Sequence, residues 1–167
     1  SYILFEEPET LNSWCMPGGK IAFYTGILDI TENEDGMASV MGHEIAHAVA
    51  KHSLERASQS LALKVGTTIL DIALEGALSS SSADDYLVNL GLTLPFNRLQ
   101  ESEADYLGLS FMTMAKYDNN EAYRVWERMQ KAQEGKTPPK FLSTHPSPKN
   151  RIEKIKNWIP EVNLRFS

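Results

Sequence analysis

The sequence predicts an α+β fold that is mostly helical, with a small sheet near its N-terminus, in a single domain of residues 1–167. Short segments rich in aromatic and branched residues occur before residue 25, whereas longer segments with helical spacing of apolar residues follow. No internal repeat interrupts this order. Hydrophobic residues make up 42% of the 167, enough for one core that needs no disulfide bonds.

Three short segments are expected to form the sheet. Tyr2–Phe5 is predicted to be an edge strand or a docking segment, and Ser13–Met16 and Ile21–Tyr24 are predicted to be two further strands. The sequence Pro17-Gly18-Gly19-Lys20 separates the last two, and such a run favours a tight turn. The sequence therefore predicts a hairpin over residues 13–24.

Helical spacing of apolar residues predicts five helices after the hairpin, over 32–59, Leu61–Leu78, 98–116, Glu121–Gln133 and Lys149–Trp158. Thr31 and Glu34 fit a capping box at the start of the first helix. Leu61–Leu78 is expected to be a core helix. Asn97 is the expected cap of the third helix, and Pro160 is expected to stop the last one.

The functional prediction depends on His43-Glu44-Ile45-Ala46-His47 in the first helix. Residues four apart lie on one face of a helix, so both imidazoles can share one metal ion. Glu44 would border that ion without binding it, in position to take a proton from a metal-bound water. This motif indicates a zinc hydrolase.

Other residues of the same helix are expected to face elsewhere. His52 follows His43 by nine residues and would lie on nearly the opposite side, as a solvated or capping histidine. Ile45 and Val49 are expected to continue an apolar stripe that packs in the core.

A catalytic zinc requires a third protein ligand. Glu101 and Asp105 are four apart and share a helix face, whereas Glu103 points about 160° away from either. Glu101 is the best candidate, with Asp105 accepting a hydrogen bond from the far nitrogen of a ligand histidine. Glu103 is expected to be a surface residue or an ion-pair partner, and His145 remains an alternative ligand.

Two motifs carry a resemblance to a known family, His43-Glu44-x-x-His47 and Glu101-x-x-Ala104-Asp105. Together they resemble the gluzincin family that holds the CAAX prenyl proteases, the HtpX heat-shock proteases and the Oma-type proteases, family forty-eight of the metallopeptidases. The lead-in over 12–28 and the tail Ser143-Thr144-His145-Pro146-x-x-x-x-Arg151-Ile152 are also similar to that family. The resemblance covers nearly the whole chain.

This resemblance implies a zincin-like (gluzincin) domain with one zinc ion per chain. By resemblance, the metal ligands are His43, His47 and Glu101. Glu44 is the general base, and Asp105 is a hydrogen-bond acceptor that orients a ligand histidine. The strand that carries Gly19, Ile21 and Phe23 would be the exposed edge to which an extended peptide adds.

His145 and Arg151 are expected to take part in catalysis. The oxyanion of peptide hydrolysis needs a donor besides zinc, and His145 is the candidate. Arg151 would hold the His145 loop or a substrate carbonyl through its planar fork. In the competing hypothesis, His145 occupies the open zinc position and keeps the enzyme latent.

The sequence thus predicts a zinc-dependent endopeptidase of protein or peptide substrates, active in envelope protein quality control. The alternative is a catalytically latent zinc-binding chaperone or interaction module of the same fold. An aminopeptidase is a weaker rival, because it needs a larger carboxylate cluster.

Analogy with soluble bacterial members predicts a periplasmic or outer-membrane-associated protein, and leaves peripheral membrane or envelope association and a homo-oligomer open. No apolar run reaches the roughly 18 residues that span a bilayer. A first residue other than Met indicates a processed or trimmed chain. The net charge of −6 argues against a nucleic-acid partner.

Overall fold

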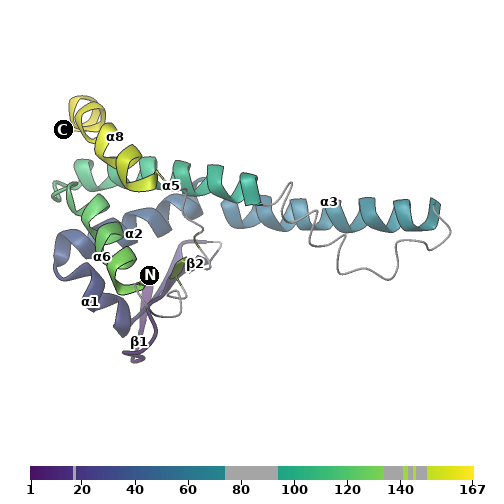
Figure 1. Ribbon diagram of the computed structural model, residues 1–167, viewed down its shortest axis with the longest axis horizontal. Helices are drawn as coiled ribbons and strands as arrows, with labels where there is room; N and C mark the ends of the chain where they lie inside the picture. Colours follow the sequence, from purple (N-terminus) through teal and green to yellow (C-terminus); the bar gives the residue numbers. More distant parts are fainter. Residues whose placement is uncertain (17, 74–93, 134–140, 143–144, 146–149) are drawn as a thin grey trace.

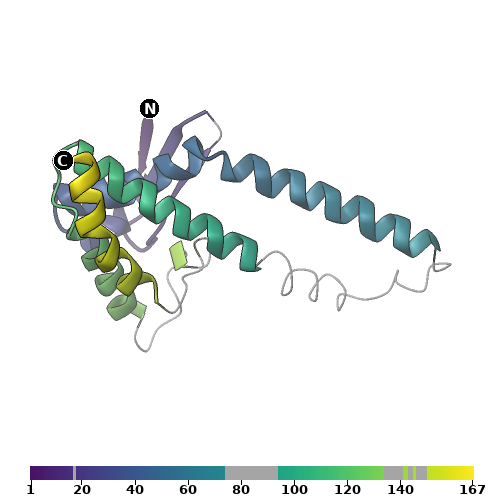
Figure 2. The same ribbon diagram turned by 90° about the horizontal axis from the view of Figure 1, so that it is seen from above.

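The protein is described here by a computed structural model, which places residues 1–16, 18–73, 94–133, 141–142, 145 and 150–167. Within these residues a small sheet and a group of helices form a body, and one helix, α3, extends away from it (Figure 1, Figure 2). The predicted α+β class, mostly helical with an N-terminal sheet, is confirmed. No helix among these residues is both long enough and apolar enough to cross a membrane.

The sheet has three strands, β1 (Tyr2–Phe5), β2 (Ser13–Met16) and β3 (Lys20–Tyr24), in the order β1-β3-β2. β2 and β3 form the predicted hairpin and are antiparallel, with Trp14 opposite Ala22. The turn between them needs glycine, because Gly18 and Gly19 have φ angles of 88° and 73°.

The expected substrate edge at Gly19, Ile21 and Phe23 is wrong. β3 is the central strand, since β1 pairs with it in parallel on the side away from β2. Ile21 and Phe23 are 7% and 2% exposed and belong to the hydrophobic core. The hairpin could be predicted from its turn, but nothing local in the sequence signals the parallel pairing of β1.

A short connection leads from the sheet into the helix that carries the metal-binding motif. It consists of η1 (Thr25–Ile27) and α1 (Leu28–Thr31), and α2 (Glu34–Val49) follows. The cap of α2 is Asn33, whose side chain accepts a hydrogen bond from the backbone N–H of Gly36 at 2.8 Å. Thr31 is therefore not the cap, because it ends α1 instead.

The predicted helix over 32–59 is in fact two helices. α2 ends at Val49, and α3 (His52–Ala73) begins after a break in which Lys51 has a φ angle of 60°. The expected core position of the Leu61–Leu78 segment is also wrong where the structure describes it. Leu61 and Val65 are 65% and 51% exposed, and residues 74–78 lie outside the described ranges.

Three further helices with described bounds are α5 (Leu94–Met114), α6 (Glu121–Gln133) and α8 (Arg151–Phe166). α6 has the predicted bounds. α5 begins before the expected cap Asn97, with Pro95 in its first turn, where a missing N–H costs little. α8 continues past Pro160 although an internal proline is unfavourable. Its later turns are apolar on one side, and Val162 is fully buried there.

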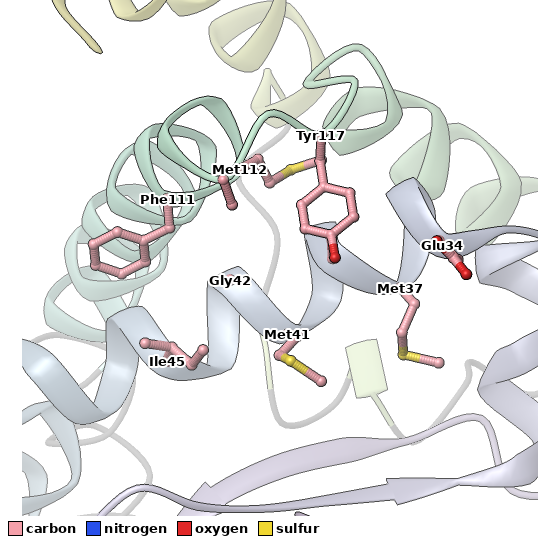
Figure 3. A pocket seen from close by; sticks show the side chains of 10 residues that line it. Glu34, Met37, Met41, Gly42, Ile45, Phe111, Met112 and Tyr117 are labelled. Atoms are coloured by element: carbon pink, nitrogen blue, oxygen red, sulfur yellow. The ribbon is translucent and has the colours of Figure 1, made fainter. Parts of the chain in front are cut away.

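An apolar groove of about 330 Å³ runs between α2 and α5 (Figure 3). Met37, Met41 and Ile45 line it from α2, and Phe111 and Tyr117 line it from the other side. Ile45 is 36% exposed and Val49, one turn further, is 61% exposed, so the predicted core stripe of α2 does not extend to these two residues.

Candidate metal centre

α2 brings three polar side chains of the motif into the interior. His43, Glu44 and His47 are 5%, 1% and 5% exposed. The Nε2 atoms of the two histidines lie 3.1 Å apart, so both rings point to one place, as their spacing predicts.

Glu101 of α5 completes a group drawn from two helices. Its Oε2 lies 3.2 Å from His43 Nε2, and its Oε1 lies 3.3 Å from His47 Nε2. The residue has no exposed surface. Of the candidates on α5, Glu101 is thus the carboxylate that meets the two histidines.

His145 joins the same group from a distant part of the chain. Its Nδ1 lies 3.1 Å from Glu101 Oε2 and 3.3 Å from His43 Nε2. Its Nε2 lies 3.3 Å from Glu44 Oε1. One ligand atom from each of His43, His47, Glu101 and His145 lies within 4.8 Å of the others.

The chemistry of this donor set fits a zinc ion. Zinc prefers imidazole nitrogen and carboxylate oxygen in four-coordinate sites, and the cluster offers three imidazoles and one carboxylate, all buried. A buried carboxylate among converging imidazoles needs a cation or a proton to balance its charge. Zinc, bound by His43, His47 and Glu101 with His145 within reach, would supply that charge.

Charge within the cluster is reflected in the pKa values of its members. Burial lowers the pKa of His47 to about 4, so its ring is neutral and able to bind a metal at neutral pH. Burial opposes ionisation of Glu101, but hydrogen bonds from His145, His43 and His47 outweigh it and hold the Glu101 pKa well below its usual value. Burial likewise disfavours charge on His145, but Glu101 and Glu44 raise its pKa to about 9.

Asp105 lies behind His43. Its Oδ1 is 3.0 Å from His43 Nδ1, on the ring edge that faces away from the cluster. Burial would raise the Asp105 pKa, yet the adjacent Arg151 and His43 lower it. The side chain is therefore an ionised acceptor, placed as the sequence predicts for a residue that orients a ligand histidine.

Arg151 faces Asp105 rather than a substrate. Its Nε and Nη2 donate to the two carboxylate oxygens at 2.6 and 2.5 Å, and its guanidinium stacks 3.4 Å from the ring centre of Trp126. The residue is 1% exposed. In the described residues the guanidinium is thus directed at Asp105, and the expected contact with the His145 loop or a substrate carbonyl stays a prediction.

His52 is the largest departure from expectation in the site. It is 1% exposed, and its Nδ1 lies 2.9 Å from His47 Nδ1. The prediction of a solvated or capping histidine is wrong because it assumed a continuous helix. The break at Lys51 turns the chain back toward the site, and no glycine or proline announces it.

Two further contacts have no signal in the sequence. Ser13 Oγ at the start of β2 donates a hydrogen bond to Glu44 Oε1 at 2.9 Å. Arg56 in α3 donates from Nη2 to Glu101 Oε1 at 3.1 Å. Both residues meet the motif only through tertiary folding.

Two glycines set the distance between the ligand-bearing helices. A Cβ atom on Gly42 would lie 3.0 Å from the carbonyl oxygen of Gly108, and one on Gly108 would lie 2.9 Å from the backbone nitrogen of His43. The backbones of α2 and α5 therefore approach more closely than side chains would allow. This crossing brings Glu101 and Asp105 to the two histidines.

Comparison with known proteins agrees with this geometry. The family described as Peptidase family M48 matches residues 1–159. The mitochondrial metalloendopeptidase OMA1 of Schizosaccharomyces pombe is 44% identical over 93% of this chain and 46% of its own length. OMA1 of Saccharomyces cerevisiae is 36% identical over 91% and 44%. The beta-barrel assembly-enhancing protease of Escherichia coli is 25% identical over 89% and 32%.

The predicted periplasmic or outer-membrane location is wrong. It followed soluble bacterial members of the family, whereas the two fungal relatives are named as mitochondrial and are more similar than the E. coli protein. The motif predicts the chemistry of the site and carries no signal for the compartment.

This chain spans less than half the length of these relatives. The family match nevertheless covers all the helices and strands that build the cluster, up to residue 159 in α8. The resemblance noted in the motifs is thereby confirmed, and the chain belongs to peptidase family M48.

Proposed function

We propose that this chain is the catalytic domain of a zinc-dependent endopeptidase that cuts protein substrates. The observation that carries the proposal is the buried convergence of His43, His47 and Glu101 with Glu44 directly beside them. A structural zinc site needs no adjacent free carboxylate, whereas a hydrolase needs one as a base.

Bound zinc would polarise a water molecule and lower its pKa toward neutrality. Glu44 is ionised and can therefore accept that proton. Burial disfavours its charge, but His145 and the other histidines lower its pKa, so it is ionised at neutral pH. The hydrogen bond from Ser13 fixes one carboxylate oxygen. Glu44 would then deliver the proton to the leaving amine of the peptide.

Asp105 and Arg151 act on His43 and not on the substrate. Asp105 accepts from His43 Nδ1, which leaves Nε2 with a lone pair directed at the cluster. Arg151 holds both oxygens of Asp105 in place. We assign both residues as positioning groups for the ligand histidine.

The substrate would pair with β2 and not, as expected from the sequence, with β3. β2 is an edge strand in the described part of the sheet, and its first residue contacts the proposed base. An extended peptide can add to such an edge through main-chain hydrogen bonds. This arrangement would lay the scissile bond beside Glu44.

A second candidate is a latent form of the same enzyme, favoured by the position of His145. Its Nδ1 belongs to the ligand cluster, so it could fill the fourth zinc position that a catalytic site keeps open. Replacement of His145 by Asn separates the roles. Activity would rise if His145 blocks the zinc, and fall if it stabilises the oxyanion.

We also propose protein quality control in the mitochondrion as the setting. The names of the fungal relatives support the compartment, and the E. coli name links a protease to β-barrel assembly. Tagging the full-length protein in its own cells would test the location, and a signal outside mitochondria would refute it.

The activity is tested with the purified chain. We expect about one zinc per chain and casein cleavage that a chelator abolishes and zinc restores. Glu44→Gln should keep the metal and lose cleavage by about 100-fold or more. Internal cleavage of end-blocked peptides would exclude an aminopeptidase. A metal-free protein, or full activity in Glu44→Gln, would refute the proposal.

A further inference from the structure

His52 is a buried histidine that contacts the metal centre through His47. Its Nδ1 is 2.9 Å from His47 Nδ1, the nitrogen of His47 that points away from Glu101 and His43. Its other nitrogen, Nε2, is 3.3 Å from Glu103 Oε2. The three side chains form a line that starts at the cluster and ends at the surface, where the Glu103 side chain is 60% exposed.

The positions of the protons in this line follow from His47. A histidine that binds a metal through Nε2 carries its proton on Nδ1. His47 Nδ1–H can then donate only to a lone pair, so His52 Nδ1 must accept. The proton of His52 consequently lies on Nε2, where the carboxylate of Glu103 accepts it. Each contact in the line thus has one donor and one acceptor.

The two histidines of the motif are therefore supported in different ways. Asp105, a carboxylate, accepts directly from His43 Nδ1. His47 Nδ1 instead contacts another imidazole, that of His52, in the part of the chain that the structure describes. Such outer partners fix the tautomer and the orientation of a ligand ring, and their removal typically weakens metal binding.

The fold places His52 there by breaking α2. In a continuous helix, residue 52 would lie about 140° around the axis from residue 47. Lys51 adopts a left-handed φ angle of 60°, and α3 begins with His52 packed against the site. Arg56, one turn later in α3, reaches Glu101. The first two turns of α3 thus contact a candidate ligand on each of α2 and α5.

We propose that His52 is a positioning residue for the metal ligand His47, acting as a hydrogen-bond acceptor that is itself oriented by Glu103. The proposal rests on the assignment of His47 as a zinc ligand under the proposed function. It concerns how tightly the chain holds zinc, and it assigns no contact between His52 and a substrate.

The test measures zinc affinity of the purified chain by competition with a chromophoric chelator. His52→Phe keeps an aromatic ring but removes both nitrogens, and we expect the zinc dissociation constant to rise roughly 10- to 100-fold. His52→Asn places an amide oxygen near the position of Nδ1, and we expect it to recover most of the lost affinity. Ser53→Ala, at the exposed neighbour, is the matched control and should bind as wild type does.

Glu103→Gln tests the outer link. The amide oxygen can still accept from His52 Nε2, so its effect should be smaller than that of His52→Phe. Spectra of the cobalt-loaded proteins give a second readout, because an altered tilt of His47 changes the visible bands of the metal. Thermal unfolding of the metal-free variants verifies that each is folded before its affinity is compared.

Wild-type zinc affinity in His52→Phe would overturn the proposal, and so would an Asn variant no better than Phe, since packing alone would then explain the residue. A wild-type chain that binds no zinc would instead refute the proposed function. The two failures are distinguishable, because failure of the His52 proposal can be observed only if the wild-type chain binds zinc.

Discussion

Ser13 and Glu44 lie 31 residues apart in sequence, and their side chains share a buried hydrogen bond of 2.9 Å in which the Ser13 hydroxyl donates. The bond joins the first residue of the edge strand β2 to the proposed general base on α2. Glu44 is also 3.3 Å from His145. Strand, helix and the His145 segment therefore meet at one carboxylate.

Replacing Ser13 with Ala should impair catalysis without loss of metal. Hydrogen bonds to charged groups contribute about 1.5–3 kcal/mol, so removal of this one should lower the free energy of unfolding by about that amount and allow Glu44 to rotate. We expect a lower kcat at unchanged zinc content, measured by peptide cleavage and metal analysis. Equal kcat and equal stability would show that the bond is unimportant.

Gly108→Ala should disturb the crossing of α2 and α5. The new methyl group would lie 2.9 Å from the backbone nitrogen of His43, so the helices must separate. Overpacking of this kind costs about 1–3 kcal/mol of unfolding free energy. Zinc affinity should also fall, because Glu101 moves away from the two histidines.

Gly66→Ala is the matched control for this substitution. Gly66 is also helical, but nothing lies within 4 Å of a Cβ atom built there. Alanine favours helix over glycine by roughly 1 kcal/mol, so stability should be unchanged or higher. Urea unfolding of the two variants compares them, and equal losses would contradict the crossing argument.

Arg151→Met should leave the buried Asp105 carboxylate without its guanidinium partner, with His43 as its remaining contact. Breaking a buried ion pair by removing one partner costs about 3–5 kcal/mol. The double variant Asp105→Asn with Arg151→Met should be more stable than Arg151→Met alone, because it removes the stranded charge. A double-mutant cycle by chemical unfolding measures this coupling, and additive effects of the two substitutions would refute it.

The metal-free chain should lose stability as the solution becomes alkaline. Burial opposes charge on His145, but Glu101 and Glu44 raise its pKa from 6.5 to about 9. A raised pKa in the folded state means that the folded chain holds the proton more tightly than the unfolded chain. The stabilisation that protonated His145 gives to the folded chain is therefore complete below pH 6.5 and disappears as the pH rises through about 9.

His145→Asn should flatten this pH dependence between 6.5 and 9. Unfolding by urea in the presence of a chelator, at several pH values, gives the comparison with wild type. His43 has a raised pKa of the same sign and remains in the variant, so part of the slope should persist. Identical slopes in both proteins would contradict the assignment to His145.

The sequence predicted those parts of the site that depend on local periodicity. Residues four apart on a helix share a face, and this alone placed His43 beside His47 and Glu101 on the side of Asp105. The hairpin turn at Gly18 and Gly19 was equally local. Each of these features needs only the geometry of a few neighbouring residues.

The remaining features depend on contacts between distant segments. The parallel pairing of β1 buried β3, and the left-handed Lys51 redirected His52 toward His47. No glycine or proline in the sequence signals the pairing of β1 with β3 or the change of direction at Lys51. Arg151 was linked to the site by its tail motif, but its partner Asp105 could be identified only once α8 and α5 were placed together.

The order of the ligands along the chain has a consequence for biosynthesis. His43 and His145 meet across 102 residues, and Arg151 follows later still. During translation the α2 histidines leave the ribosome before His145 and α8, so a nascent chain that has not yet reached them lacks part of the cluster. The complete arrangement around Glu44 and His43 would therefore form only after segments about 100 residues apart have packed together.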